Sequence, residues 1–119
     1  MSKKVADKET RDALHAEALR LQRAAMSGVP IPMPQRTAMK GHAQAMFEQW
    51  LELEAARFNT TSEDYKAAID GLNGAIKELK AEIDALDNAI RTLERATEAI
   101  KAGDALLKLA IENLPISPF

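Results

Sequence analysis

An Ile or Leu recurs at every third or fourth position of residues 69–93, and this stripe constrains the fold more than any other feature of the chain. Spacing of three and four places the side chains on one face of an α-helix. No strand-like alternation accompanies it, so we expect an all-α fold in which this helix packs along its whole length. The stripe consists of Ile69, Leu72, Ile76, Leu79, Ile83, Leu86, Ile90 and Leu93.

The stripe predicts one long, coiled-coil-like helix over residues 60–102. Thr60 and Glu63 match a capping box at its start, in which each side chain bonds the other's backbone amide. Gly103 and Asp104 offer a helix stop followed by a new N-cap. The helix therefore either continues beyond Gly103 or breaks there, and the pattern leaves both outcomes open.

Helix-breaking residues elsewhere in the chain indicate two further helices within a single domain. Prolines alternate in the sequence VPIPMP of residues 29–34, which forbids helix and favours an extended spacer packed on a helix surface. An exposed recognition strand is the alternative for this segment. The resulting prediction for residues 1–119 is an elongated helical hairpin or three-helix bundle. Its expected segments are helix 3–27, spacer 28–35, helix 36–58 lying antiparallel to long helix 60–102, segment 104–113 and extended tail 114–119.

Heptad positions argue against the simplest coiled coil. With Ile69 at position a, the stripe places Ile at a and Leu at d, the combination that favours parallel dimers. The flanking e and g positions supply no attractive pair, however, and Glu82 and Asp87 would repel one another. Ala at most g positions widens the apolar face, as in a multi-helix bundle. Gly71 and Gly74 lie on the opposite side, and we interpret them as admitting another helix rather than as merely tolerated near the helix start.

Part of the stripe is expected to remain for another subunit, because large apolar residues are few in the first two helices. Trp50 and Met46 are predicted to lie in the core, with an exposed anchor for a partner as the alternative. The candidate interface residues are Ile76, Leu79, Ile83, Leu86, Ile90, Leu93, Gly71, Gly74, Trp50 and Met46.

No motif for catalysis, a cofactor or a metal is recognisable. The chain has no Cys, and His15 and His42 lack the spacing of a metal-binding pair. The segment GLNGAIK at residues 71–77 lacks the spacing and the hydroxyl residue of a phosphate-binding loop. No small-molecule substrate is evident either. We therefore expect a protein without enzymatic activity.

Charge and composition point to binding between proteins. Residues 1–59 carry nine Lys/Arg and seven Asp/Glu, and residues 60–119 carry seven and eleven. This mild polarity makes nucleic acid an unlikely partner, and no apolar run is long enough for a membrane span. We expect an assembly factor, adaptor, structural subunit or inhibitor that binds itself or another protein, in the cytoplasm or, if viral, in a virion. Size and composition suit a bacterial or phage accessory protein.

Two other functions remain open from the sequence. A nucleic-acid-associated regulator would use the basic residues of the first helix, which include Arg11, Arg20 and Arg23. A membrane-surface protein would use the apolar segment 105–114, although Lys108 is its only basic residue.

Overall fold

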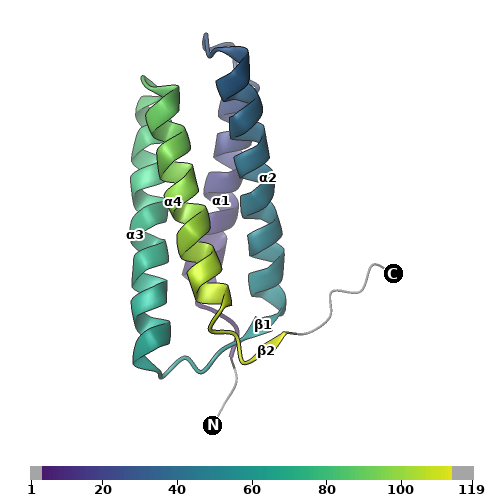
Figure 1. Cartoon of the computed structure of the whole chain (residues 1–119), viewed down its shortest axis with the longest axis vertical. Helices are drawn as coiled ribbons and strands as arrows, with labels where there is room; N and C mark the ends of the chain where they lie inside the picture. Colours follow the sequence, from purple (N-terminus) through teal and green to yellow (C-terminus); the bar gives the residue numbers. More distant parts are fainter. Residues whose placement is uncertain (1–3, 114–119) are drawn as a thin grey trace, which may run out of the picture.

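The computed structural model describes residues 4–113 and confirms the all-α class, with four helices packed against each other (Figure 1). Two very short strands pair with each other at one end of the helices. The tail expected over residues 114–119 lies outside the described part of the chain. The elements are α1 (Lys8–Ala25), α2 (Met33–Ala55), β1 (Ala56–Arg57), α3 (Glu63–Ala85), α4 (Ala89–Leu107) and β2 (Glu112–Asn113).

The prediction of one long C-terminal helix is wrong, because the chain reverses between α3 and α4. Leu86 ends α3 in the left-handed conformation, at φ 42° and ψ 39°. Asn88 then caps α4 by accepting a hydrogen bond from the amide of Arg91 at 3.0 Å. The 3-4 spacing continues through the turn without a slip, so periodicity alone gave no sign of it. The helix does not break at Gly103, which lies buried inside α4.

The other helix ends also differ from the expected ones. α2 begins at Met33, before the end of the predicted spacer, with Pro34 in its first turn. Proline suits that turn because the first helical amides have no partner within the helix. α3 is capped by Ser62 rather than Thr60: the Ser62 hydroxyl accepts a hydrogen bond from the Tyr65 amide at 3.1 Å.

The helices form two hairpins that lie side by side. α1 packs against α2 and α3, while α4 packs against α3 and α2. The connections within both hairpins lie at one end of the bundle, which we call the apex, and β1 and β2 lie at the other, the base (Figure 1). α3 therefore packs on α1 and α4, and the expectation that helix 36–58 would lie antiparallel beside the start of the long helix is wrong.

The Ile/Leu stripe supplies much of the core within this one chain. Large apolar side chains from all four helices are fully buried, which removes apolar surface from water at about 25 cal/mol per Å². The fully buried ones on the helices are Leu14, Leu21, Met39, Met46, Leu53, Leu72, Leu79 and Leu106, and Phe58 in the connection after β1 is fully buried as well.

Polar pairs fix how the two hairpins sit against each other. Between α1 and α3, the Thr10 hydroxyl donates to the Asn73 side-chain oxygen at 2.7 Å. Between α2 and α4, His42 Nε2 lies 3.0 Å from the Thr97 hydroxyl, and Gln49 donates to the Ile100 carbonyl at 2.6 Å. Hydrogen bonds are directional, so these contacts favour one register between the hairpins.

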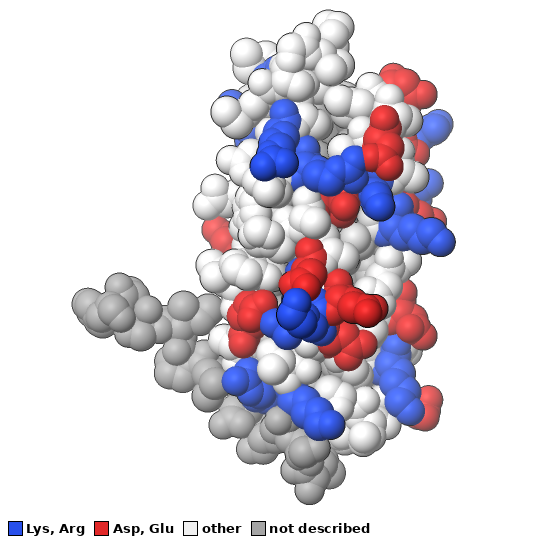
Figure 2. All heavy atoms as spheres, turned by 180° about the vertical axis from the view of Figure 1, so that it is seen from behind, with Lys and Arg blue, Asp and Glu red and all other residues white. Residues whose placement is uncertain are grey.

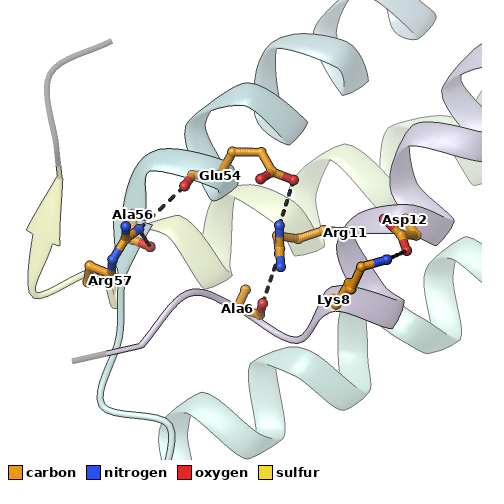
Figure 3. A network of polar contacts seen from close by, with 7 residues as sticks. All are labelled: Ala6, Lys8, Arg11, Asp12, Glu54, Ala56 and Arg57. Atoms are coloured by element: carbon orange, nitrogen blue, oxygen red, sulfur yellow. Dashed lines mark hydrogen bonds and ion pairs between the residues drawn. The ribbon is translucent and has the colours of Figure 1, made fainter. Parts of the chain in front are cut away.

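The base is held by backbone pairing and by two arginines (Figure 3). β1 pairs antiparallel with β2, and Lys4 exchanges two backbone hydrogen bonds with Phe58. Arg11 donates to the Ala6 carbonyl at 2.9 Å and to the Glu54 carboxylate at 2.7 Å (Figure 3). Arg57 donates to the carbonyl of Glu54 as well. The segment before α1 is thereby fastened to the end of α2.

Tyr65 adds a contact at the base that predicts a pH dependence. Its hydroxyl accepts from the Asp7 amide at 3.1 Å and donates to the Asp7 carboxylate at 3.2 Å. Burial raises the pKa of Tyr65 to about 12 from the usual 10.0. The unfolded chain loses this proton more readily, so the contribution of Tyr65 to stability is complete below pH 10 and is lost as the pH rises to about 12.

We therefore expect Tyr65→Phe to cost about 1 kcal/mol at neutral pH and to flatten the fall in stability between pH 10 and 12. Urea unfolding across this pH range measures the free energy of unfolding of both proteins. Both contain the same lysines, so the contributions of the lysines cancel in the difference between them. The chain has a single tyrosine, so tyrosinate absorbance follows the same group directly. A midpoint near pH 10 in the folded protein would contradict the prediction.

Candidate interaction surface

Most of the predicted interface stripe faces the chain's own core. Ile76, Leu79 and Ile83 are buried, as is Met46 on α2, so these four side chains are inaccessible to a partner in this fold. Leu86 and Leu93 are half-buried and pack against the core. Ile90 differs from the rest of the stripe, since 58% of its surface is exposed, close to the apex turn.

Trp50 joins α2 to α1 and is half-buried. Its ring lies 4.6 Å from the ring of His15, which also lies 5.5 Å from the ring of Phe47. The aromatic group therefore forms a contact within one hairpin, in keeping with the preferred interpretation of Trp50 as a packing residue.

Gly71 and Gly74 lie beside an open groove between α3 and α4. Both are exposed, and a Cβ placed on either would meet no atom within 4 Å. α4 lines the other side of this groove, but none of its atoms lies within 4 Å of either absent Cβ, so neither glycine is in close contact with another helix of this chain. The cavity measures about 910 Å³, and we call it the α3–α4 groove. Its lining is Asp70, Gly71, Gly74, Ala75, Glu78, Glu94, Arg95, Thr97, Glu98, Lys101 and Ala102.

The α3–α4 groove combines a lining of small residues with acidic edges. One ion pair joins its two walls, between Arg95 and Glu78 at 3.1 Å. Asp70, Glu94 and Glu98 make no ion pair with a described residue, and Lys101 is the other basic residue of the lining. The groove therefore presents more negative than positive charge.

At the apex, one arginine organises the connection between α1 and α2. The Arg36 guanidinium donates to three backbone carbonyls of the preceding turn, those of Ala25, Ser27 at 3.1 Å and Val29 at 2.9 Å. The planar guanidinium has five donors in a fixed arrangement, so it holds the turn in one conformation. Pro30 and Pro32, at either side of Ile31, further restrict the backbone.

This fixed turn displays apolar side chains to solvent. We call the set Met26, Val29, Met33 and Ile90 the apex surface. Met26 and Met33 are 68% and 69% exposed, and Val29 is 38% exposed. A cavity of about 300 Å³ separates the α1–α2 connection from the α3–α4 turn and is lined by Ile31, Leu86 and Ile90 among others. The spacer interpretation expected the VPIPMP segment to pack on a helix surface, and the segment is more exposed than that expectation.

The apex of the first hairpin is also free of acidic residues. Between Glu17 and Glu48 the sequence contains only basic charges, at Arg20, Arg23, Arg36 and Lys40. Figure 2 shows the top of the molecule largely white, with charged side chains beginning below it. This run of thirty residues without Asp or Glu is the sequence signal that could have identified the apex surface in advance.

The basic side chains of α1 are mostly paired with acids. Lys8 binds Asp12, Arg11 binds Glu54, and Arg20 binds both Glu17 and Asp84. Charges neutralised in this way are less able to bind phosphates, which weakens the nucleic-acid alternative. Arg23 has no ion-pair partner among the described residues.

Within the described part of segment 105–114, several large apolar residues are used in packing. Leu106 is fully buried, and Leu107 and Leu109 pack against the core. Ile111 is 48% exposed. Within residues 4–113, no helix combines the length and the hydropathy that a membrane span requires.

Neither histidine belongs to a cluster of metal ligands. His42 lies 2.8 Å from the Ala38 carbonyl through Nδ1 and bonds Thr97 through Nε2, and His15 packs on aromatic rings. The described part of the chain contains no group of three or more His, Asp or Glu side chains able to hold a metal ion together.

Similarity to other proteins adds no functional assignment to this geometry. Two surfaces remain as candidates for function, the α3–α4 groove and the apex surface. No protein-family model matches the chain, and neither a curated protein nor a solved structure was found to match it.

Proposed function

We propose that the protein is a non-catalytic protein–protein interaction module that self-associates through the α3–α4 groove. The supporting observation is the groove itself, about 910 Å³ in volume and flanked by Gly71 and Gly74, whose missing side chains leave open space. The central residues of the Ile/Leu stripe are buried in the chain's own core, which favours the groove over the stripe as the interface.

The two glycines make this groove suitable for close contact with another chain. Glycine within a helix costs about 1 kcal/mol relative to Ala, and no contact inside this chain offsets that cost, since the space beside both residues is empty. A second chain that packs against the bare backbone would gain contact area unavailable against larger side chains. Ala75 and Ala102 extend the same small lining.

The experiment fills the groove without disturbing the fold. Gly71→Gln with Gly74→Gln adds two long neutral side chains at open positions, and glutamine is a better helix former than glycine. Gly41→Gln is the matched control, because Gly41 on α2 is also exposed and open but lies outside the groove. Light scattering over a range of protein concentrations measures association, and circular dichroism confirms folding.

We expect the wild-type protein and the Gly41→Gln variant to associate, and the double variant to be a folded monomer. A wild-type protein that stays monomeric at every concentration would refute self-association. If the double variant associates as strongly as the wild type, the groove is not the interface.

A further inference from the structure

We infer that the segment which enters the α3–α4 groove is the apex surface of a second copy of this chain. The inference rests on the proposed self-association and names the occupant of the groove. Both surfaces lie within the described chain, one at the end of the bundle and one along the outer side of α3 and α4. The contact joins two different surfaces, so it is heterologous in the sense used for subunit interfaces.

The first argument is the chemical match of side chains to the groove. Met26 and Met33 are long, unbranched and about two-thirds exposed. Methionine adapts its three rotatable bonds to irregular gaps. The space beside Gly71 and Gly74 is such a gap, since no side chain and no other element lies within 4 Å of either absent Cβ. Burial of the methionines would remove the largest exposed apolar side chains of the apex from water.

The second argument is charge complementarity. Arg23 and Lys40 are exposed near the apex and have no ion-pair partner among the described residues. Lys40 shares a cavity of about 300 Å³ with Met26, so a basic and an apolar group stand together. At the groove, Glu94 and Glu98 lie one helical turn apart on α4 with no ion pair to a described residue. Opposite charge on the two surfaces favours their encounter and fixes their orientation.

The third argument is that the apex is already ordered for binding. Arg36 holds three carbonyls of the turn, and two prolines restrict the segment that follows. A segment fixed in its binding conformation loses less conformational entropy on association than a flexible one. The apex surface can therefore act as a rigid projection.

A charge-exchange experiment tests this assignment. Arg23→Glu with Lys40→Glu makes the apex acidic, and Glu94→Lys with Glu98→Lys makes the groove basic. Each variant alone then opposes like charges, whereas a mixture of the two restores an attractive pair at every apex–groove contact. Lys77→Glu with Lys80→Glu is the control for net charge, since both residues are exposed on α3 outside the groove.

We expect each test variant alone to associate at least about tenfold more weakly than the wild type. The equimolar mixture should recover association, and the control should resemble the wild type at moderate ionic strength. Met26→Ser with Met33→Ser, which changes no charge, should also weaken association. All four substituted sites of the charge exchange are exposed, and circular dichroism checks that every variant is folded.

The outcomes separate this inference from the proposed function. If the acidic-apex variant or the methionine variant associates like the wild type, or if the mixture stays monomeric, the apex does not occupy the groove. The glutamine variants of Gly71 and Gly74 would still report on the groove in that case. A monomeric wild-type protein would overturn both proposals together.

Discussion

Leu79→Ala is expected to lower the free energy of unfolding by about 2–5 kcal/mol, the range for truncation of a fully buried leucine. Leu79 has no exposed surface and belongs to the central core cluster. The substitution removes buried apolar atoms and leaves a cavity that neighbouring helices refill only in part. Urea unfolding at a fixed, low protein concentration measures the change.

The matched control comes from the same stripe. Ile90 continues the 3-4 spacing of Leu79 but is 58% exposed, so Ile90→Ala should change the free energy of unfolding by about 0.5 kcal/mol or less. The pair distinguishes a fold in which α3 and α4 form a hairpin from one in which both residues lie on one continuous seam. Equal losses at the two positions would contradict the hairpin described here.

Gly103→Ala is expected to destabilise the protein, although Ala favours helix over Gly. A Cβ at Gly103 would lie 2.5 Å from Oε1 of Gln49, and Gln49 is buried. Its amide nitrogen donates to the Ile100 carbonyl at 2.6 Å and to the Asp104 carboxylate at 2.9 Å. Moving the side chain disrupts these bonds, and overpacking of this kind costs about 1–3 kcal/mol.

Two comparisons isolate the cause. Gly74→Ala places its methyl group in open space, so thermal unfolding of the monomer should show stabilisation by about 0.5–1 kcal/mol. In a protein that already carries Gln49→Ala, adding Gly103→Ala should raise the free energy of unfolding, because the side chain that obstructs the new methyl group is absent. If Gly103→Ala lowers stability equally in both backgrounds, Gln49 is not the cause.

Local sequence chemistry was sufficient for several features of the fold. The period of the Ile/Leu stripe correctly predicted a helical core face, since Ile69, Leu72 and Ile76 are all buried. The helical class and the end of the first helix, expected at residue 27 and observed at Ala25, also follow from residue types and spacing. These features depend on neighbours within one or two helical turns, which a sequence displays directly.

The candidate surfaces were harder to predict. Gly71 and Gly74 were placed on the outer side of their helix, but the groove beside them requires α4 to lie alongside, which the long-helix prediction precluded. The apex surface likewise depends on Ile90 and the residues around Val29 meeting at one end of the bundle. Proximity between segments so far apart in sequence is a property of the tertiary structure.

The sequence by itself determined that the stripe residues from Ile69 to Ile83 bury one helical face, and the tertiary structure decided what covers that face. A continuous helix covered by a second chain and a hairpin folded back on itself satisfy the same pattern, because the 3-4 spacing persists through the turn. The hairpin requires Leu86 to adopt the left-handed conformation, which costs about 1–2 kcal/mol for a residue with a Cβ. Packing of α4 against both α3 and α2 offsets that cost, and such long-range contacts exist only once the chain has folded.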